Sequence, residues 1–124
     1  MHAPGLDRPG LWRAVGWCLI VAVVYLSLTP HPPPSAMSYG DKLNHFAGYA
    51  ALMAWWLQLE RQVWRLALLL IVLSLILEIL QDLSGYRQGD IYDMAANTCG
   101  VALGWLATRL LPDWLPRIER LLPR

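Results

Sequence analysis

Long apolar runs separated by short polar breaks constrain this sequence more than any other feature. The clearest run covers about 63–81, and its centre from Leu66 to Leu77 contains no charged residue. Three further runs cover about 11–28, 43–59 and 91–111. Each run is close to the roughly 20 residues that a helix needs to cross a bilayer. The pattern predicts an all-α membrane protein with four transmembrane helices in a single domain, 1–124.

The composition agrees with a chain that folds in lipid. Hydrophobic residues make up 56% of the sequence and charged residues 15%, whereas a soluble domain carries about a quarter charged residues. The formal net charge of +1 gives no reason to expect a nucleic-acid partner. Cys18 and Cys99 both lie inside apolar runs, where cysteine usually packs as a small hydrophobe. We predict no cofactor and no metal from these features.

The first apolar run has an alternative interpretation as a cleaved signal peptide. It follows a positively charged start, but it ends at Thr29 and a proline-rich stretch, 30–34, where a signal peptide would carry small residues around its cleavage site. A retained helix is therefore the prediction, and cleavage is the alternative.

The positive charges predict the orientation in the membrane. With four spans, only Lys42 and Arg87 fall on one side, and eight arginines fall on the other. Loops rich in lysine and arginine stay in the cytoplasm, so both termini are expected there. The last segment, 113–124, is expected to lie on the membrane surface as an amphipathic tail. The eight arginines are Arg8, Arg13, Arg61, Arg65, Arg109, Arg117, Arg120 and Arg124.

Polar residues gather at the expected outer ends of the second, third and fourth helices. Their spacings of three and four residues put them on one face of each helix. An ionised group near hydrocarbon is costly unless it is paired or hydrated, so these faces should converge into one outward-facing polar site. The predicted ligand-binding residues are Asp41, Lys42, His45, Tyr49, Glu78, Gln81, Arg87, Asp90, Asp93 and Asn97.

Some of these residues also have a purely structural explanation. Asn97 and Gln81 could hydrogen-bond between helices, and Asp90 is a plausible N-cap for the fourth helix. His45 and Glu78 lie inside apolar sequence and are harder to explain in that way. Together with Asp93, they are the candidate catalytic residues.

A GxxxG pattern, Gly100 to Gly104, marks the fourth helix. Small residues let helices approach closely in lipid, and the pattern is common by chance in apolar helices. It predicts tight helix packing, and a homo-oligomer could form through the same face.

The polar motifs resemble those of the VanZ-like family of small bacterial membrane proteins. Asp41-Lys42 with His45 and Tyr49 resembles its opening motif, and Glu78 with Gln81 resembles its Glu-x-x-Gln. A later motif of the family is Arg…Asp…Asp-x-x-x-Asn with a following glycine. It is resembled here by Arg87, Asp90, Asp93, Asn97 and Gly100. The resemblance covers about 11–111. It implies an inner-membrane protein, in a family whose founding member is associated with low-level resistance to the glycopeptide teicoplanin.

Three functions fit these features. The site could bind a lipid-linked or glycopeptide-type envelope ligand, with Lys42 and Arg87 holding a phosphate or carboxylate and the acidic groups holding amines or hydroxyls. Membrane lipids would be its other partners. The alternative is an intramembrane enzyme acting on a lipid or envelope precursor, with His45 as general base or with His45 and carboxylates around a divalent metal. A proton or ion path is the third hypothesis, and no ionisable residues continue it deep into the cytoplasmic half.

Overall fold

The computed structural model describes residues 5–30, 40–85 and 90–124, with the side chains of 40 and 41 left out. This part of the chain forms helices and no strands, which confirms the predicted all-α class. The helices are α1 (Pro9–Leu28), α2 (Gly40–Trp56), α3 (Val63–Ser84), α4 (Ile91–Leu110) and α5 (Trp114–Glu119).

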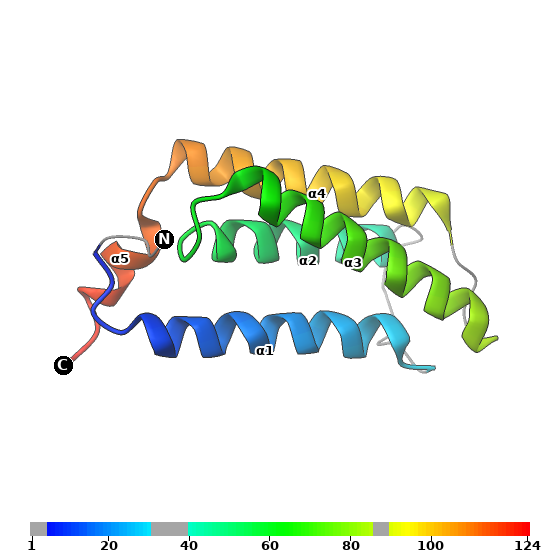
Figure 1. Cartoon of the computed structure of the whole chain (residues 1–124), viewed down its shortest axis with the longest axis horizontal. Helices are drawn as coiled ribbons and strands as arrows, with labels where there is room; N and C mark the ends of the chain where they lie inside the picture. Colours follow the sequence, from blue (N-terminus) through cyan, green and yellow to red (C-terminus); the bar gives the residue numbers. More distant parts are fainter. Residues whose placement is uncertain (1–4, 31–39, 86–89) are drawn as a thin grey trace.

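The four long helices lie along the longest axis of the molecule, and successive helices run in opposite directions (Figure 1). One end holds the start of α1, the connection from α2 to α3, the end of α4 and the short helix α5 (Figure 1). The other end holds the end of α1, the start of α2, the end of α3 and the start of α4 (Figure 1). Polar residues predicted at the starts of the second and fourth helices and at the end of the third are therefore brought to the same end.

The second helix is displaced by three residues at both ends from the predicted range of 43–59. It ends at Trp56 because the next residues fold into a turn, in which Gln58 N donates to Trp55 O at 3.0 Å. The buried Gln58 side chain then accepts a hydrogen bond from Leu115 N at 3.2 Å. The end of α2 therefore coincides with a contact to a residue that is distant in the sequence, which the local pattern does not reveal.

The third helix continues to Ser84, beyond its predicted end at 81. Gly85 follows it with φ of 73°, a left-handed conformation that glycine adopts at little cost and that commonly ends a helix. At the start of α4 the Asp90 carboxylate accepts from Tyr92 N at 2.8 Å, which confirms the predicted N-cap.

Among the described helices, α1 and α3 are long and apolar enough to cross a membrane by length and composition. Their mean hydropathies over 18 residues are 1.9 and 2.5. Helix α1 lies near the N-terminus, where a signal sequence has the same property. Four spans therefore stay a prediction.

The surface of the long helices is unusually apolar, and several polar side chains are inside. On α3, Trp64 is 88% exposed and Leu83 78%, whereas Glu78 on the same helix is 6% exposed. A water-soluble protein has the opposite arrangement, because exposed apolar patches of this kind favour association. The buried polar residues are Ser27, Gln58, Ser74, Glu78, Gln81, Asp93, Asn97 and Glu119.

The closest helix pair is α2 and α4, which meet through glycine. A Cβ atom at Gly100 would collide with the carbonyl oxygen of Phe46, and one at Gly104 with that of Ala50. The GxxxG face therefore packs against α2 of the same chain. A homo-oligomer through this face stays a prediction, and it would have to displace α2.

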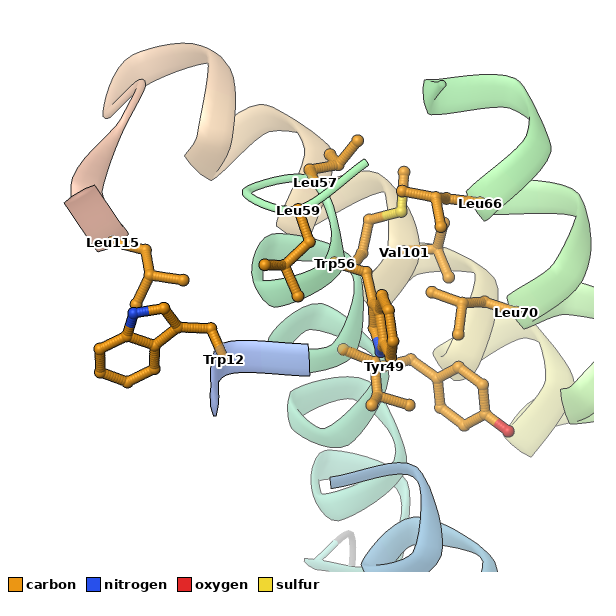
Figure 2. Packing of buried hydrophobic residues seen from close by; sticks show 11 residues of the cluster. Trp12, Tyr49, Trp56, Leu57, Leu59, Leu66, Leu70, Val101 and Leu115 are labelled. Atoms are coloured by element: carbon orange, nitrogen blue, oxygen red, sulfur yellow. The ribbon is translucent and has the colours of Figure 1, made fainter. Parts of the chain in front are cut away.

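Apolar side chains of α2 form the centre of the core. Tyr49, Leu52, Met53 and Trp56 are all buried, and Figure 2 shows α3 and α4 contributing leucine and valine side chains around them. Trp12 and Leu115 extend this core toward the start of α1 and toward α5 (Figure 2).

The C-terminal tail is tied to the N-terminal segment by one carboxylate. Glu119 accepts hydrogen bonds from Asp7 N at 2.8 Å, from Arg8 N at 2.9 Å and from Trp12 Nε1 at 2.8 Å. Leu115 and Pro116 of α5 are also buried. Within the predicted tail, 113–124, this helix packs on the protein itself; contact with a membrane surface stays a prediction.

Adding a methyl group at the α2–α4 interface should destabilise the fold. We expect Gly100→Ala to lower the free energy of unfolding by about 1–3 kcal/mol, because backbone atoms cannot move aside as a flexible side chain would. Gly10→Ala is the matched control, since a Cβ there meets nothing within 4 Å. Unfolding of both variants in detergent measures the difference, and equal stability of the two would contradict this packing.

Acid should release the tail. Burial would raise the pKa of Glu119, but its hydrogen bonds from Trp12, Asp7 and Arg8 outweigh burial and hold the pKa below its usual 4.5. The carboxylate therefore adds stability above the unfolded pKa, and this is lost as the pH falls through the folded pKa.

We expect the difference in free energy of unfolding between the wild type and Glu119→Gln to be full at pH 7 and to shrink below pH 4.5. Asp113→Asn is the control, because the Asp113 carboxylate is 57% exposed in its contact with Arg61. A wild-type advantage that does not change with pH would show that this contact does not depend on the charge of Glu119.

Candidate functional site

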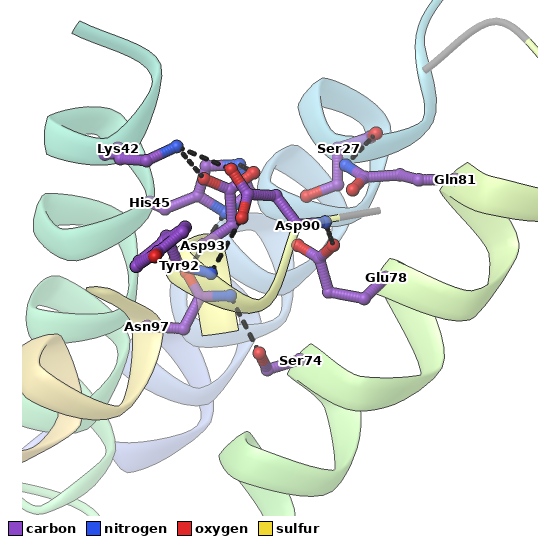
Figure 3. Close-up of polar contacts among 10 residues, drawn as sticks. All are labelled: Ser27, Lys42, His45, Ser74, Glu78, Gln81, Asp90, Tyr92, Asp93 and Asn97. Atoms are coloured by element: carbon purple, nitrogen blue, oxygen red, sulfur yellow. Dashed lines mark hydrogen bonds and ion pairs between the residues drawn. The ribbon is translucent and has the colours of Figure 1, made fainter. Parts of the chain in front are cut away.

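Six of the predicted site residues come together where α2 and α4 begin and α3 ends. Figure 3 shows their side chains pointing toward one another from these three elements and from the residue that caps α4. They are Lys42 and His45 on α2, Glu78 on α3, Asp90 at the N-cap of α4, and Asp93 and Asn97 on α4. We call them the polar cluster.

Lys42 links two acidic groups at the more open side of the cluster. Its Nζ atom lies 2.8 Å from Asp90 Oδ2 and 3.1 Å from Asp93 Oδ1. The side chains of Lys42 and Asp90 are 37% and 34% exposed, and that of Asp93 is 6% exposed. The hydrogen bond from Lys42, followed by that from Tyr92 N, holds the pKa of Asp90 below its usual value. The positive charge of Lys42 is therefore already balanced by two carboxylates of the protein.

His45 is oriented by a short chain of hydrogen bonds. Its Nδ1 lies 3.0 Å from Asn97 Oδ1, and Asn97 Nδ2 donates to Ser74 Oγ at 2.7 Å. Because an amide oxygen only accepts, Nδ1 is the nitrogen that carries the proton. Nε2 faces Asp93 Oδ2 at 3.8 Å.

Glu78 completes the cluster from α3. Its Oε2 accepts from Asp90 N at 2.9 Å, so it also supports the start of α4. One carboxylate oxygen each of Glu78 and Asp93 and one ring nitrogen of His45 all lie within 4.8 Å of one another. Three helices therefore bring an imidazole and two carboxylates to one point.

Two predicted site residues lie near the cluster but have other contacts. Gln81 donates to the backbone oxygen of Ser27 at 2.6 Å, which joins α3 to α1 (Figure 3). Tyr49 is 2% exposed and belongs to the apolar core (Figure 2). Arg87 and the side chain of Asp41 lie outside the described residues, so their predicted roles stay predictions.

A model of the VanZ/LLP1 family matches residues 17–112. This chain belongs to the VanZ/LLP1 family. Comparisons with curated proteins and with solved structures give no match. The match confirms the resemblance drawn from the motifs at Asp41, Glu78 and Arg87. Together with the two apolar helices, it indicates a membrane protein associated with the cell envelope.

The region that matches the VanZ/LLP1 family contains the whole polar cluster and its supporting residues. It also contains Gly100 and Gly104, which set the approach of α4 to α2. The tail contact at Glu119 lies outside the matched range. The family match therefore covers the site and the packing that forms it, and leaves out the contact between the two chain ends.

The described cluster is acidic and rich in hydrogen-bond acceptors. Three carboxylates, those of Glu78, Asp90 and Asp93, meet one ammonium group, that of Lys42, and the imidazole of His45. Such a set suits ligand groups that donate hydrogen bonds, such as hydroxyls and amines, or a cation. Two cavities of about 330 and 360 Å³ lie at the opposite end of the bundle, beside Glu60 and Asp113, and neither is lined by the cluster.

The sequence interpretation missed two residues that bind predicted site residues of this VanZ/LLP1 protein. Ser74 holds the amide of Asn97, and Ser27 offers its backbone oxygen to Gln81. Ser74 carried a usable signal, because it stands four residues before Glu78 and so shares its helix face. Ser27 acts through its backbone, for which a sequence gives no signal.

Removing the Ser74 hydroxyl should loosen His45. We expect Ser74→Ala to destabilise the protein by about 1–3 kcal/mol, because the buried amide of Asn97 loses its acceptor. Thr98→Ala is the control, since Thr98 is exposed and its hydroxyl bonds only within α4. Unfolding in detergent compares the two variants. A cost for Thr98→Ala as large as that for Ser74→Ala would argue against the hydrogen-bond chain.

Proposed function

We propose that this protein spans the inner membrane four times, with both termini in the cytoplasm, and that the polar cluster binds a lipid-linked or glycopeptide-type envelope ligand. Binding of such a ligand would modulate envelope properties or antibiotic tolerance. The observation that carries the proposal is the polar cluster itself, in which three helices place acceptor groups at one end of a bundle with an apolar surface.

The distribution of charge supports the proposed orientation. The start of α1, the α2–α3 connection, the end of α4 and α5 lie at one end of the bundle, and Arg8, Arg61, Arg109 and Arg117 belong to these segments. The cluster lies at the other end, where Lys42 is paired with two carboxylates. Arginine-rich segments stay in the cytoplasm, so the cluster would face outward.

The chemistry of the cluster favours ligand groups that donate hydrogen bonds. Lys42 is held by Asp90 and Asp93, and a ligand anion would have to compete with both carboxylates for it. Asp90 is one-third exposed, so it is the described carboxylate that a ligand reaches first. Hydroxyl and amine groups of a glycopeptide or of a lipid-linked sugar fit these acceptors.

A binding measurement on the full chain in lipid nanodiscs tests the proposal, with teicoplanin as the probe. We expect saturable binding by the wild type and about 10- to 150-fold weaker binding by Asp90→Asn, because a hydrogen bond to a charged group contributes about 1.5–3 kcal/mol. Asp113→Asn, a charge change at the opposite end, should bind like the wild type.

In cells that produce the protein, Asp90→Asn should lower teicoplanin tolerance, and Asp113→Asn should leave it unchanged. Wild-type nanodiscs that bind no teicoplanin would count against a glycopeptide-type ligand, and full binding by Asp90→Asn would place the ligand away from the cluster. A lipid-linked envelope precursor, used as the second probe, distinguishes the two ligand types.

An intramembrane enzyme is the second candidate, favoured by the setting of His45. Asn97 fixes one ring nitrogen, and the other faces Asp93 at 3.8 Å, an arrangement that suits a general base. The test is to recover a lipid or envelope precursor from the nanodiscs. Chemical alteration of the precursor by the wild type, and none by His45→Gln, would favour the enzyme over the binding protein.

A further inference from the structure

The three residues that meet at the centre of the cluster come from three different helices. One donor atom each of His45 on α2, Glu78 on α3 and Asp93 on α4 lies within 4.8 Å of the others. Ligand atoms of a metal ion bound at about 2.1 Å are roughly 3–4 Å apart. Small side-chain rotations therefore close the present arrangement onto an ion.

Each of these three side chains is held from behind by its other polar atom. Asn97 binds His45 Nδ1, Lys42 binds Asp93 Oδ1, and the backbone of Asp90 binds Glu78 Oε2. Such partners are what metal ligands require, because they fix the orientation of each ligand before the ion arrives. The asparagine also determines the tautomer: with the proton on Nδ1, the lone pair of a neutral imidazole is on Nε2, which faces Asp93.

The charge at this point calls for a cation. As whole residues, Glu78 is 6% exposed and Asp93 is 4% exposed. Among the described side chains, no lysine or arginine forms an ion pair with Glu78, whose carboxylate receives one hydrogen bond, from Asp90 N. A buried carboxylate is costly when it is poorly compensated, and the cost is larger next to lipid. The single ammonium of Lys42 is shared between Asp90 and Asp93.

We propose that His45, Glu78 and Asp93 bind a divalent transition-metal ion, with zinc as the best-fitting case. One imidazole nitrogen and two carboxylate oxygens suit zinc or manganese, whereas calcium takes six to eight oxygen ligands. Three coordinating side chains leave at least one coordination position for water or for an oxygen atom of a bound molecule. The site stands on this geometry alone and does not depend on the proposed envelope ligand.

Metal analysis of the purified full chain tests the site with the ion alone. After treatment with EDTA and dialysis against zinc, we expect about one zinc per chain and a higher unfolding temperature. Glu78→Gln should lower zinc affinity at least tenfold, while the retained amide oxygen can still accept from Asp90 N. Glu60→Gln, at the opposite end beside Arg13, should bind zinc like the wild type.

Asn97→Ala tests the hydrogen bond that supports His45. Loss of a partner behind a metal ligand costs about 10–100-fold in affinity, so this variant should still bind zinc, but more weakly. A zinc affinity of Glu78→Gln equal to that of the wild type, or a wild type that takes up no zinc, would overturn the proposal.

A measurement on the wild type keeps the test independent of variants that do not fold. The chain contains 3 histidines, and nitrogen NMR during zinc titration should shift the Nε2 resonance of one of them while Nδ1 stays protonated. His45→Gln identifies that resonance as His45. A shift that remains in His45→Gln would assign the ion to another histidine and overturn the site, and the teicoplanin measurement would be unaffected.

Discussion

The close approach of α2 and α4 is the constraint on which the rest of the structure depends. Gly100 and Gly104 lie against the backbone of α2 at Phe46 and Ala50, and no larger residue would fit there. His45 precedes Phe46, and Asn97 stands three residues before Gly100, so the contact that seats the glycines also brings imidazole and amide within hydrogen-bond distance. The apolar packing and the polar cluster are therefore two consequences of one helix contact.

The surroundings decide which residues face inward. Trp64 and Leu83 of α3 face outward while Glu78 of the same helix faces its neighbours, the reverse of a soluble bundle. In hydrocarbon an apolar side chain can face outward at little cost, although Leu66, Leu70 and Leu77 of α3 are buried, whereas a polar group that finds no partner is costly. Hydrogen bonds such as Asn97 to Ser74 and Gln81 to Ser27 then specify how the helices fit together.

The sequence predicts the long helices and the convergence of three polar faces, because apolar periodicity and spacings of three and four residues are local properties. It does not predict which neighbour a polar residue meets. Gln81 shares a face with Glu78, yet it turns to α1. The turn after α2 places Gln58 against Leu115, and the Glu119 carboxylate accepts a hydrogen bond from Trp12; neither partner is visible in the local sequence. These contacts join residues that are more than 50 positions apart.

The polar cluster also explains why α2 and α4 are less hydrophobic than α1 and α3. Each carries ionisable groups whose partners are on the other helix: Lys42 on α2 contacts Asp93 on α4, and His45 contacts Asn97. Pairing of the two helices largely buries His45, Asp93 and Asn97 and joins Lys42, whose side chain is 37% exposed, to two carboxylates. Hydropathy scores each helix as if it were alone. The polar residues that lower the hydropathy of α2 and α4 are thus also contacts between these two helices, made in addition to the glycine packing at Gly100 and Gly104.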